Sequence, residues 1–347
     1  MNAKITTDVM DAGAALTERR RPVVAVVIPC FNEAAAIDKV VRDFRSALPE
    51  ARVFVYDNAS TDETSAIARR AGAVVRAEPQ RGKGNVVRRM FADIEADIFV
   101  LVDGDDTYDA AAAPGLVTML IENSLDMVNA TRAPLSEQAY RAGHQFGNAL
   151  LTGVVARIFG NRITDMLSGY RVFSRRFVKS FPTLSAGFEI ETELTIHALE
   201  LRLPIAEVTV GYKERPEGSM SKLKTYSDGY RIFKFIFRLI KQEKPFQFFG
   251  AIFLLLLATS VAMEIPVIVT FMRTGLVPRL PTALLGTGIA LLAFMSLTCG
   301  LILDTVTRGR AEAKRMHYLS IPIRFSGVRD DAYVVRSKYA RTPTSAS

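Results

Sequence analysis

Residues 98–109, IFVLVDGDDTYD, place an apolar run directly before a cluster of acidic side chains. The run IFVLV is rich in branched and aromatic residues, which predicts a buried strand. Four carboxylates follow at Asp103, Asp105, Asp106 and Asp109. Like charges that lie so close together raise the cost of ionising one another. The stretch therefore predicts a cationic partner at the end of this strand.

Segments of the same kind alternate with helical patterns along residues 23 to about 225. Short apolar runs predict strands at 23–29, 51–57, 73–78 and 97–103. Apolar residues at helical spacing predict helices between them, at 35–48, 61–72 and 84–96. Regular alternation of this kind predicts an α/β fold, in which helices cover a mostly parallel sheet.

Polar residues follow the predicted strands. They are PCFNE at 29–33, DNASTD at 57–62, RGKG at 81–84 and DGDD at 103–106. In open α/β sheets, ligands bind outside the carboxyl ends of the strands. The four segments are therefore expected to meet at one edge and form a binding site. RGKG lacks the GxxxxGK[ST] spacing of a P-loop, so ATPase activity is not expected.

Two long apolar segments predict a transmembrane helical hairpin. Residues 246–272 contain one charged side chain and residues 282–303 contain none, and about 20 helical residues suffice to cross the hydrocarbon core. Two buried core helices are the alternative. Cations flank both segments, at Arg231, Lys234, Arg238, Lys241, Lys244, Arg308, Arg310, Lys314 and Arg315. The positive-inside rule then places both flanks in the cytoplasm.

The single charge inside the first apolar segment is Glu264. A carboxylate inside hydrocarbon is costly and often has a function, for example in helix pairing or in handling a lipid. Pro266 is expected to end the helix near the outer interface. We therefore favour a position for Glu264 at the level of the lipid headgroups.

The chain is expected to have five parts. Residues 1–22 form a flexible lead that lacks the apolar core of a signal peptide, and residues 23–226 form the α/β domain. Residues 227–245 form an amphipathic helix at the membrane surface, with an ordinary core helix as the alternative. Residues 246–307 hold the two spans, and 308–347 form a basic cytosolic tail.

Composition limits the partners of the chain. Its 347 residues include 44 Lys and Arg against 36 Asp and Glu, a surplus of eight positive charges that suits an anionic partner. No nucleic-acid recognition motif is present, and the cations gather near the apolar segments, so a lipid bilayer is favoured over nucleic acid. Cys30 and Cys299 do not suggest a disulfide framework, which indicates a reducing compartment.

The four polar segments, in this order, resemble the motifs of family 2 glycosyltransferases with the GT-A fold. Residues 164–173, TDMLSGYRVF, and 212–231, YKERPEGSMSKLKTYSDGYR, resemble the polyprenyl-phosphate and dolichyl-phosphate sugar synthases of that family. The resemblance implies a Rossmann-like, mostly parallel sheet. It also implies transfer of a sugar, with inversion, from a nucleotide-diphosphate sugar to a polyprenyl phosphate. UDP is preferred over GDP, and undecaprenyl phosphate at the bacterial inner membrane is the expected acceptor, with the catalytic domain in the cytosol.

The resemblance also assigns a metal site. It places Asp103 nearer the ribose of the donor and Asp105 nearer a divalent cation, Mg²⁺ or Mn²⁺, and these hard cations prefer oxygen ligands. Many relatives carry Gln two places after the second aspartate, where this chain has Thr107. The third ligand is therefore open between Asp106, Thr107 and water.

The remaining site residues are matched one by one to the family motifs. Those expected at the donor nucleotide and its phosphates are Pro29, Asn32, Glu33, Asp57, Asn58, Lys83, Arg215, Ser221 and Lys222. Lys83 meets donor phosphate or fixes its loop, two alternatives that stay open. Arg132 and Arg171 are expected around the phosphates, because arginine suits phosphate contact, and Asp165 is a candidate for orienting the acceptor.

Two other functions are less consistent with the residues. A processive polysaccharide synthase normally carries a QxxRW motif, and this chain has no tryptophan. A sensor or scaffold without catalysis is not expected to keep the aspartates and the arginines together. A glycosyltransferase that uses another lipid as its acceptor remains an open alternative. The sugar, the prenyl length, the downstream pathway and the oligomeric state, including a homo-oligomer, are not readable from the sequence.

Overall fold

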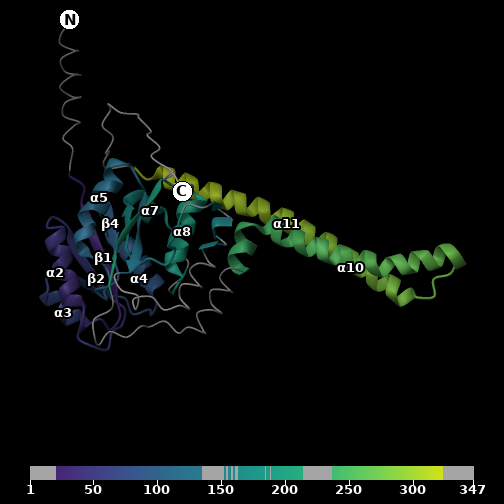
Figure 1. The fold of residues 1–347 in the computed structure, drawn as a ribbon, viewed down its shortest axis with the longest axis horizontal. Coiled ribbons are helices and arrows are strands. Elements are labelled where there is room, and N and C mark those ends of the chain that lie inside the picture. Colours follow the sequence, from purple (N-terminus) through teal and green to yellow (C-terminus); the bar gives the residue numbers. More distant parts are fainter. Residues whose placement is uncertain are drawn as a thin grey trace, which may run out of the picture.

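The computed structural model describes most of the chain (Figure 1). The described residues are 21–134, 152–160 without 154 and 158, 163–213 without 184 and 188, and 237–322. Statements about structure below refer to these residues.

Seven strands form one sheet in the order β3-β2-β1-β4-β6-β5-β7. Every neighbouring pair is parallel except the two pairs that include β6. The strands are β1 (Val24–Cys30), β2 (Arg52–Asp57), β3 (Val74–Ala77), β4 (Ile98–Leu101), β5 (Met127–Pro134), β6 (Arg171–Ser174) and β7 (Ile205–Tyr212). The predicted α/β fold with a mostly parallel sheet is confirmed.

Helices cover both faces of the sheet, because the strands are apolar on both sides. Along β1, Ala25 and Val27 belong to one buried cluster, whereas Val26 and Ile28 belong to the other. The first cluster includes side chains of α4 (Lys83–Asp93), α7 (Arg175–Ser180) and α8 (Ile190–Glu200). The second includes side chains of α2 (Ile37–Ala47), α3 (Thr64–Arg70), η1 (Ala110–Ala112) and α5 (Ala113–Glu122).

The carboxyl ends of the central strands meet at one edge, as expected. In the parallel register Cys30 pairs with Asp57, and Val27 pairs with Leu101. The segments that follow β1, β2 and β4 therefore leave the sheet side by side. This edge carries the acidic turn that starts at Asp103.

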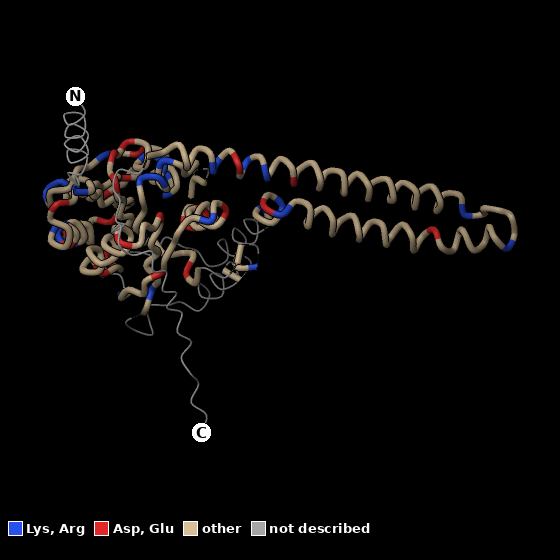
Figure 2. Tube along the Cα trace, turned by 90° about the horizontal axis from the view of Figure 1, so that it is seen from above, with Lys and Arg blue, Asp and Glu red and all other residues tan. Residues whose placement is uncertain are grey.

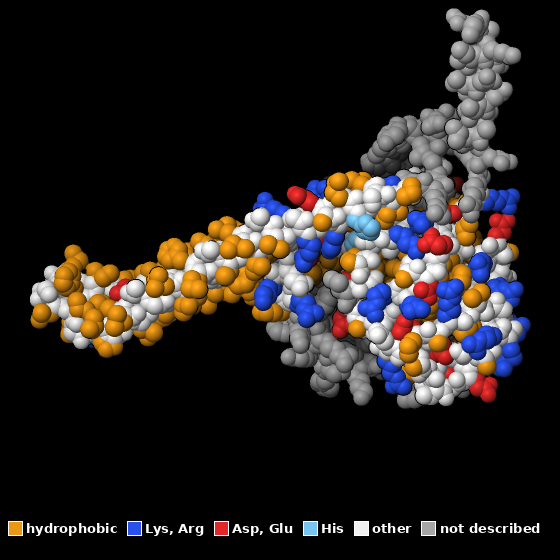
Figure 3. All heavy atoms as spheres, turned by 180° about the vertical axis from the view of Figure 1, so that it is seen from behind, with side chains coloured by type: hydrophobic (Ala, Val, Ile, Leu, Met, Phe, Trp, Pro, Cys, Tyr) orange, Lys and Arg blue, Asp and Glu red, His pale blue; other side chains and the backbone are white. Residues whose placement is uncertain are grey.

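Two helices extend from the domain as an antiparallel hairpin, α10 (Pro245–Thr274) and α11 (Leu280–Ser320) (Figures 1 and 2). Both are long and apolar enough to cross a membrane, and only 11% of the most apolar window of each is buried inside the protein. Apolar side chains cover much of the hairpin surface in Figure 3. This exposure does not fit the alternative of two core helices.

The hairpin differs from the sequence-based expectation at Pro266. Helix α10 continues through Pro266 to Thr274, so the expectation that Pro266 ends the helix is wrong. Leaving the helix there would expose backbone polar groups on an apolar surface. Glu264 instead faces α11, where a Cβ added to Gly286 would lie 2.3 Å from Glu264 Oε1. The absent side chain of Gly286 leaves room for the carboxyl group.

Helix α11 is longer than the predicted second span. It continues past residue 303 to Ser320, so the predicted basic tail begins inside a helix. Residues 237–243 of the predicted surface helix are helical. Residues 227–236 of that segment and residues 323–347 of the tail lie outside the described residues.

The end of α11 packs on the α/β domain. Tyr318 donates a hydrogen bond to Asp126 Oδ2 at 2.6 Å, and Lys314 lies 2.5 Å from Glu200 Oε2. Asp126 directly precedes β5, and Glu200 ends α8 before β7. Both contacts therefore lie at the amino edge of the sheet, opposite the edge that carries the acidic turn.

His197 of α8 gives this region a predicted pH dependence. Burial and, to a smaller extent, the nearby Lys314 lower the pKa of His197 from 6.5 to about 3. The unfolded chain takes up this proton as the pH falls below 6.5, whereas the folded protein does so only near pH 3. The group therefore contributes stability above pH 6.5 that is lost as the pH falls through this window.

We expect His197→Gln to make the free energy of unfolding less dependent on pH. Between pH 6.5 and 5, the wild type should lose about 2 kcal/mol more than the variant. Chemical denaturation in detergent at the two pH values measures this difference. His317→Gln is the matched control, because His317 is exposed, and it should keep the wild-type dependence. Equal pH slopes for wild type and His197→Gln would contradict the assignment.

Candidate active site

The acidic turn after β4 is fixed by close packing. A Cβ added to Gly104 would lie 2.6 Å from Cys30 Sγ, so only glycine fits between the turn and the end of β1. Asp105 is buried, and its Oδ1 accepts hydrogen bonds from the hydroxyl of Thr107 at 2.7 Å and from its amide at 3.3 Å. The turn thus holds the carboxylate of Asp105 in one position.

Lys83 joins three elements beneath this turn. It is the first residue of α4, and its ammonium contacts Asp103 Oδ1 at 2.5 Å and also Glu191 of α8. Burial alone would lower the pKa of Lys83, but the two carboxylates raise it above its ordinary value. Burial raises the pKa of Glu191, and Lys83 partly offsets that shift. The buried Oε2 of Glu191 has no hydrogen-bond partner among the described residues.

The loop before β6 closes over Asp103. A Cβ added to Gly169 would lie 2.1 Å from Asp103 Oδ2, so glycine is required for this approach. The amide of Gly169 donates to the hydroxyl of Tyr108 at 2.9 Å, and Ser168 donates to the carbonyl of Ala130 at 2.5 Å. The two predicted motifs, DGDD and SGYR, are therefore in direct contact.

Arg132 and Asp165, both predicted from the family motifs, form one ion pair. The guanidinium donates from Nε to Asp165 Oδ2 at 2.7 Å and from Nη2 to Oδ1 at 2.8 Å. It also lies over the ring of Tyr212, 5.6 Å from the centroid. Burial would raise the pKa of Asp165, but Arg132 outweighs that effect and the pKa is lowered. Asp165 is therefore ionised at neutral pH and holds the orientation of Arg132.

Arg171 requires a correction. It is fully buried, and its guanidinium donates to the carbonyls of Ser168 at 3.0 Å and Met166 at 2.7 Å and to the hydroxyl of Thr195 at 2.8 Å. Burial lowers its pKa. An arginine whose donors are used inside the core cannot reach a substrate phosphate, so the predicted phosphate contact is wrong. The hydrogen bonds of Arg171 instead connect the SGYR loop to α8.

The residues expected at the nucleotide lie around the ends of β1 and β2. Asp57 accepts from the amide of Ser60 at 3.0 Å and from the hydroxyl of Ser65 at 2.5 Å. Asn32 has a positive φ of 54°, and its Oδ1 accepts from the amide of Thr61 at 2.8 Å.

Asn58 supports the neighbouring loop. Its Nδ2 donates to the carbonyls of Glu78 at 2.9 Å and Gln80 at 2.7 Å, and its Oδ1 accepts from the amide of Gly82 at 2.7 Å. These bonds use the whole amide group to shape the loop before Lys83.

The other predicted donor residues differ in what the structure describes. Pro29 lies within β1 opposite Tyr56, and the backbone amide of the buried Glu33 donates to Thr64 Oγ1 at 2.9 Å. The predicted Arg215, Ser221 and Lys222 lie outside the described residues.

Two carboxylates of the turn remain candidates for a metal. Asp106 accepts from Lys39 at 3.0 Å and from Lys213 at 3.2 Å, so lysines already balance its charge. The described part of the chain contains no group of three or more His, Cys, Asp or Glu side chains arranged for a metal ion. Mg²⁺ sites in phosphate-transfer enzymes commonly use one or two carboxylates, with water and substrate phosphates as the other ligands. Asp103 and Asp105 fit such a site.

A family model described as "Glycosyl transferase family 2" matches residues 25–181. The chain is 32% identical to glycosyltransferase AglJ of Haloferax volcanii, over 70% of this chain and 80% of that protein. The chain belongs to glycosyl transferase family 2. Dolichyl-phosphate hexose transferase of the same organism is 28% identical over 66% of this chain and 99% of that protein.

A solved structure shares the fold of this glycosyltransferase. Glucosyl-3-phosphoglycerate synthase from Mycobacterium tuberculosis, in complex with Mn²⁺ and UDP-glucose, is 25% identical and superposes with a TM-score of 0.52. The match covers 67% of this chain and 82% of that chain. The GT-A fold expected from the sequence motifs is confirmed.

Sequence reasoning missed Glu191 and Tyr108 as members of the site. Glu191 lies in the stretch EIETE, where three acidic residues alternate with other types. Nearly every position of α8 is buried, so the helix has no polar face that would single out one carboxylate. The only sequence signal was an acidic residue within an otherwise buried helix.

We expect the two arginines to respond differently to substitution. Arg171→Leu removes the hydrogen bonds of a guanidinium inside the core and should lower the free energy of unfolding by about 3 kcal/mol or more. Arg132→Lys keeps the charge but loses the bidentate geometry, so it should slow sugar transfer and leave a folded protein. Thermal unfolding and transfer assays on both variants measure this. An Arg171→Leu protein of wild-type stability that has lost transfer activity would restore the phosphate role.

Proposed function

We propose that this glycosyltransferase moves a hexose from a nucleoside diphosphate sugar to a polyprenyl phosphate in a membrane. The observation that carries the proposal is the continuity of α11, which runs from an apolar hairpin into direct contact with the glycosyltransferase domain. A catalytic domain held in this way works next to a bilayer. An acceptor that is itself a membrane lipid fits this arrangement.

The acidic turn supports the donor half of the proposal. Asp103 and Asp105 would hold Mg²⁺ or Mn²⁺ together with the donor diphosphate, with water as the simplest further ligand. When bound, such an ion stabilises the negative charge that develops on the leaving diphosphate. The M. tuberculosis relative was solved with Mn²⁺ and UDP-glucose, which supports a UDP-sugar as the favoured donor.

Lys83 and Glu191 also support the proposed binding of the nucleotide-sugar donor. The ammonium fixes the carboxylate of Asp103 and offsets the repulsion between Asp103 and Asp105, which lie two residues apart. Lys83 also stands at the start of α4, where the amide groups of the first turn favour an anion. Asp57, Asn32 and Glu33 would line the base and the ribose.

Arg132 supports the acceptor half. Its orientation is fixed by Asp165 and by the ring of Tyr212, and a guanidinium suits the phosphate of the acceptor. An ionised phosphate is already a nucleophile, so it requires no strongly activated base. It would attack the anomeric carbon opposite the leaving nucleoside diphosphate. A single displacement of this kind inverts the configuration at that carbon.

The hairpin supports a place in the bacterial inner membrane with the catalytic domain in the cytosol. Between Leu280 and Leu303 there is no charged residue, whereas cations follow from Arg308 onward. This distribution supports a cytoplasmic position of the domain. The relative named dolichyl-phosphate hexose transferase supports a lipid phosphate as acceptor.

A transfer assay tests the proposal. The full chain in detergent is incubated with Mn²⁺, undecaprenyl phosphate and a panel of labelled UDP- and GDP-sugars. We expect one labelled product that extracts into butanol and is cleaved by mild acid, and we expect none when undecaprenyl alcohol replaces the phosphate. Transfer to a water-soluble acceptor, with none to the lipid phosphate, would overturn the proposed acceptor.

We expect Asp105→Asn to lower this transfer rate by about a hundredfold or more, because the metal loses a charged ligand. The fold should persist, since the substitution preserves the size of the side chain and its contact with Thr107. Asp109→Asn is the matched control. Asp109 is an exposed carboxylate of the same turn that caps η1, and its variant should retain activity. Near-normal transfer by Asp105→Asn would remove the metal role.

A further inference from the structure

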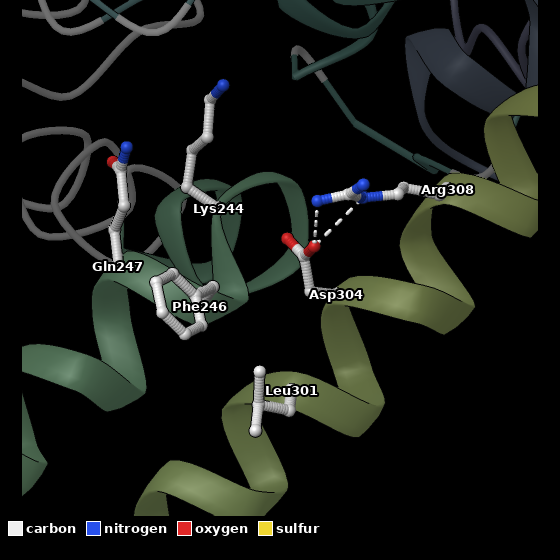
Figure 4. Close-up of a pocket in the computed structure, with 6 residues that line it drawn as sticks. All are labelled: Lys244, Phe246, Gln247, Leu301, Asp304 and Arg308. Carbon is white, nitrogen blue, oxygen red and sulfur yellow. Dashed lines mark hydrogen bonds and ion pairs between the residues drawn. The ribbon is translucent and has the colours of Figure 1, made fainter.

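A pocket of about 380 Å³ lies where the two helices of the hairpin meet the domain (Figure 4). It is far from the acidic turn along the chain and belongs to other elements. Its wall is formed by the start of α10 and by the middle of α11. The lining residues are Lys244, Phe246, Gln247, Leu301, Asp304 and Arg308.

The pocket spans the boundary between apolar and charged surface. On α11, Leu301 is 53% exposed, and Asp304 is the first charged residue after the long uncharged segment. On α10, Lys244 directly precedes the helix and Phe246 is 46% exposed. In the membrane placement proposed above, the apolar wall faces hydrocarbon and the charged rim faces the cytoplasmic headgroups.

The charge of the pocket is positive. The ammonium of Lys244 has no hydrogen bond or ion pair within the described part of the chain, whereas Arg308 pairs with Asp304 at 2.7 Å. Figure 4 shows Lys244, which directly precedes α10, and Arg308 of α11 on opposite sides of the pocket, with the Lys244 side chain extended away from Phe246 and Leu301. Within the described ranges no side chain caps the start of α10, and the positive end of this 30-residue helix favours an anion at the same place. Asp304 opposes an anion, but two cations outnumber it.

We propose that this pocket binds the phosphate group of a membrane lipid. Lys244 and Arg308 contact the phosphate, and the hydrocarbon chain lies along Phe246 and Leu301. The inference rests on the proposed membrane placement and not on the identity of the sugar acceptor. The phosphate comes from an anionic phospholipid or from a polyprenyl phosphate, and the two sources share the chemistry that the pocket recognises.

Native mass spectrometry of the detergent-purified full chain tests this proposal. Phosphatidylglycerol, undecaprenyl phosphate and diacylglycerol are added separately, and the last has no phosphate. We expect retention of phosphatidylglycerol and little retention of diacylglycerol. Lys244→Gln and Arg308→Gln should each lower phosphatidylglycerol retention about fivefold, the effect of one cation at a lipid surface.

Two further variants distinguish lipid binding in the pocket from attraction of the lipid to surface charge in general. Arg310→Gln is the matched control, because Arg310 pairs with Glu243 and does not line the pocket, and it should retain the lipid. Asp304→Asn should increase retention, since it removes the opposing charge, whereas a merely structural role for the Asp304–Arg308 pair would predict a decrease.

The outcomes distinguish the possible failures. If phosphatidylglycerol and undecaprenyl phosphate both depend on Lys244 and Arg308, the pocket accepts lipid phosphate in general, and dependence of one alone identifies the source. Equal retention of diacylglycerol and phosphatidylglycerol would overturn the proposal that the pocket binds lipid phosphate. Unchanged lipid retention in Lys244→Gln and Arg308→Gln would also overturn it. If the full chain is found in the soluble fraction of cells without detergent, the membrane placement fails instead.

Discussion

The ammonium of Lys83, held between Asp103 and Glu191, is the contact on which the candidate active site depends. It joins the start of α4, the turn after β4 and the middle of the buried helix α8. Removing one partner of a buried ion pair leaves an uncompensated charge, which is strongly destabilising. Without the lysine, Asp103 and Glu191 would face each other unpaired. The ammonium therefore makes it possible for carboxylates to gather at this edge before any metal arrives.

The carboxyl and amino edges of the sheet carry different features. The carboxyl edge of the sheet carries the acidic turn, Lys83 and the pair of Arg132 with Asp165. The amino edge receives the end of α11 through Tyr318 and Lys314. Because α11 is one continuous helix of 41 residues, the hairpin and the contacts at the amino edge belong to the same helix. The attachment therefore lies at the edge of the sheet opposite the acidic turn.

Much of the fold could be predicted from the sequence. Apolar runs of strand length, separated by helical patterns, fix a parallel sheet, and the polar segments after the strands then fall at one edge by geometry. The family motifs add site roles for Asp103, Asp105, Arg132 and Asp165, and these roles remain predictions. The fold could be predicted because periodicity is a local property that is repeated along the chain.

The remaining features depend on tertiary contacts that no local pattern records. Arg171 stands in a family motif, yet the core supplies the acceptors for its guanidinium. Glu191 is recognised only through its contact with Lys83, which lies over a hundred residues away in the sequence. Pro266 is tolerated because an apolar surface penalises an interrupted helix, and the space beside Gly286 accommodates Glu264.

We propose that the edge around Lys83 receives a nucleoside diphosphate together with a divalent cation. Calorimetric titration of UDP into the full chain, with and without Mn²⁺, tests it most directly. We expect Mn²⁺ to tighten UDP binding by at least about fivefold in the wild type, the lower end of common coupling between two ligands, and to have no such effect in Asp105→Asn. UDP affinity that is the same with and without Mn²⁺ in the wild type would contradict the account.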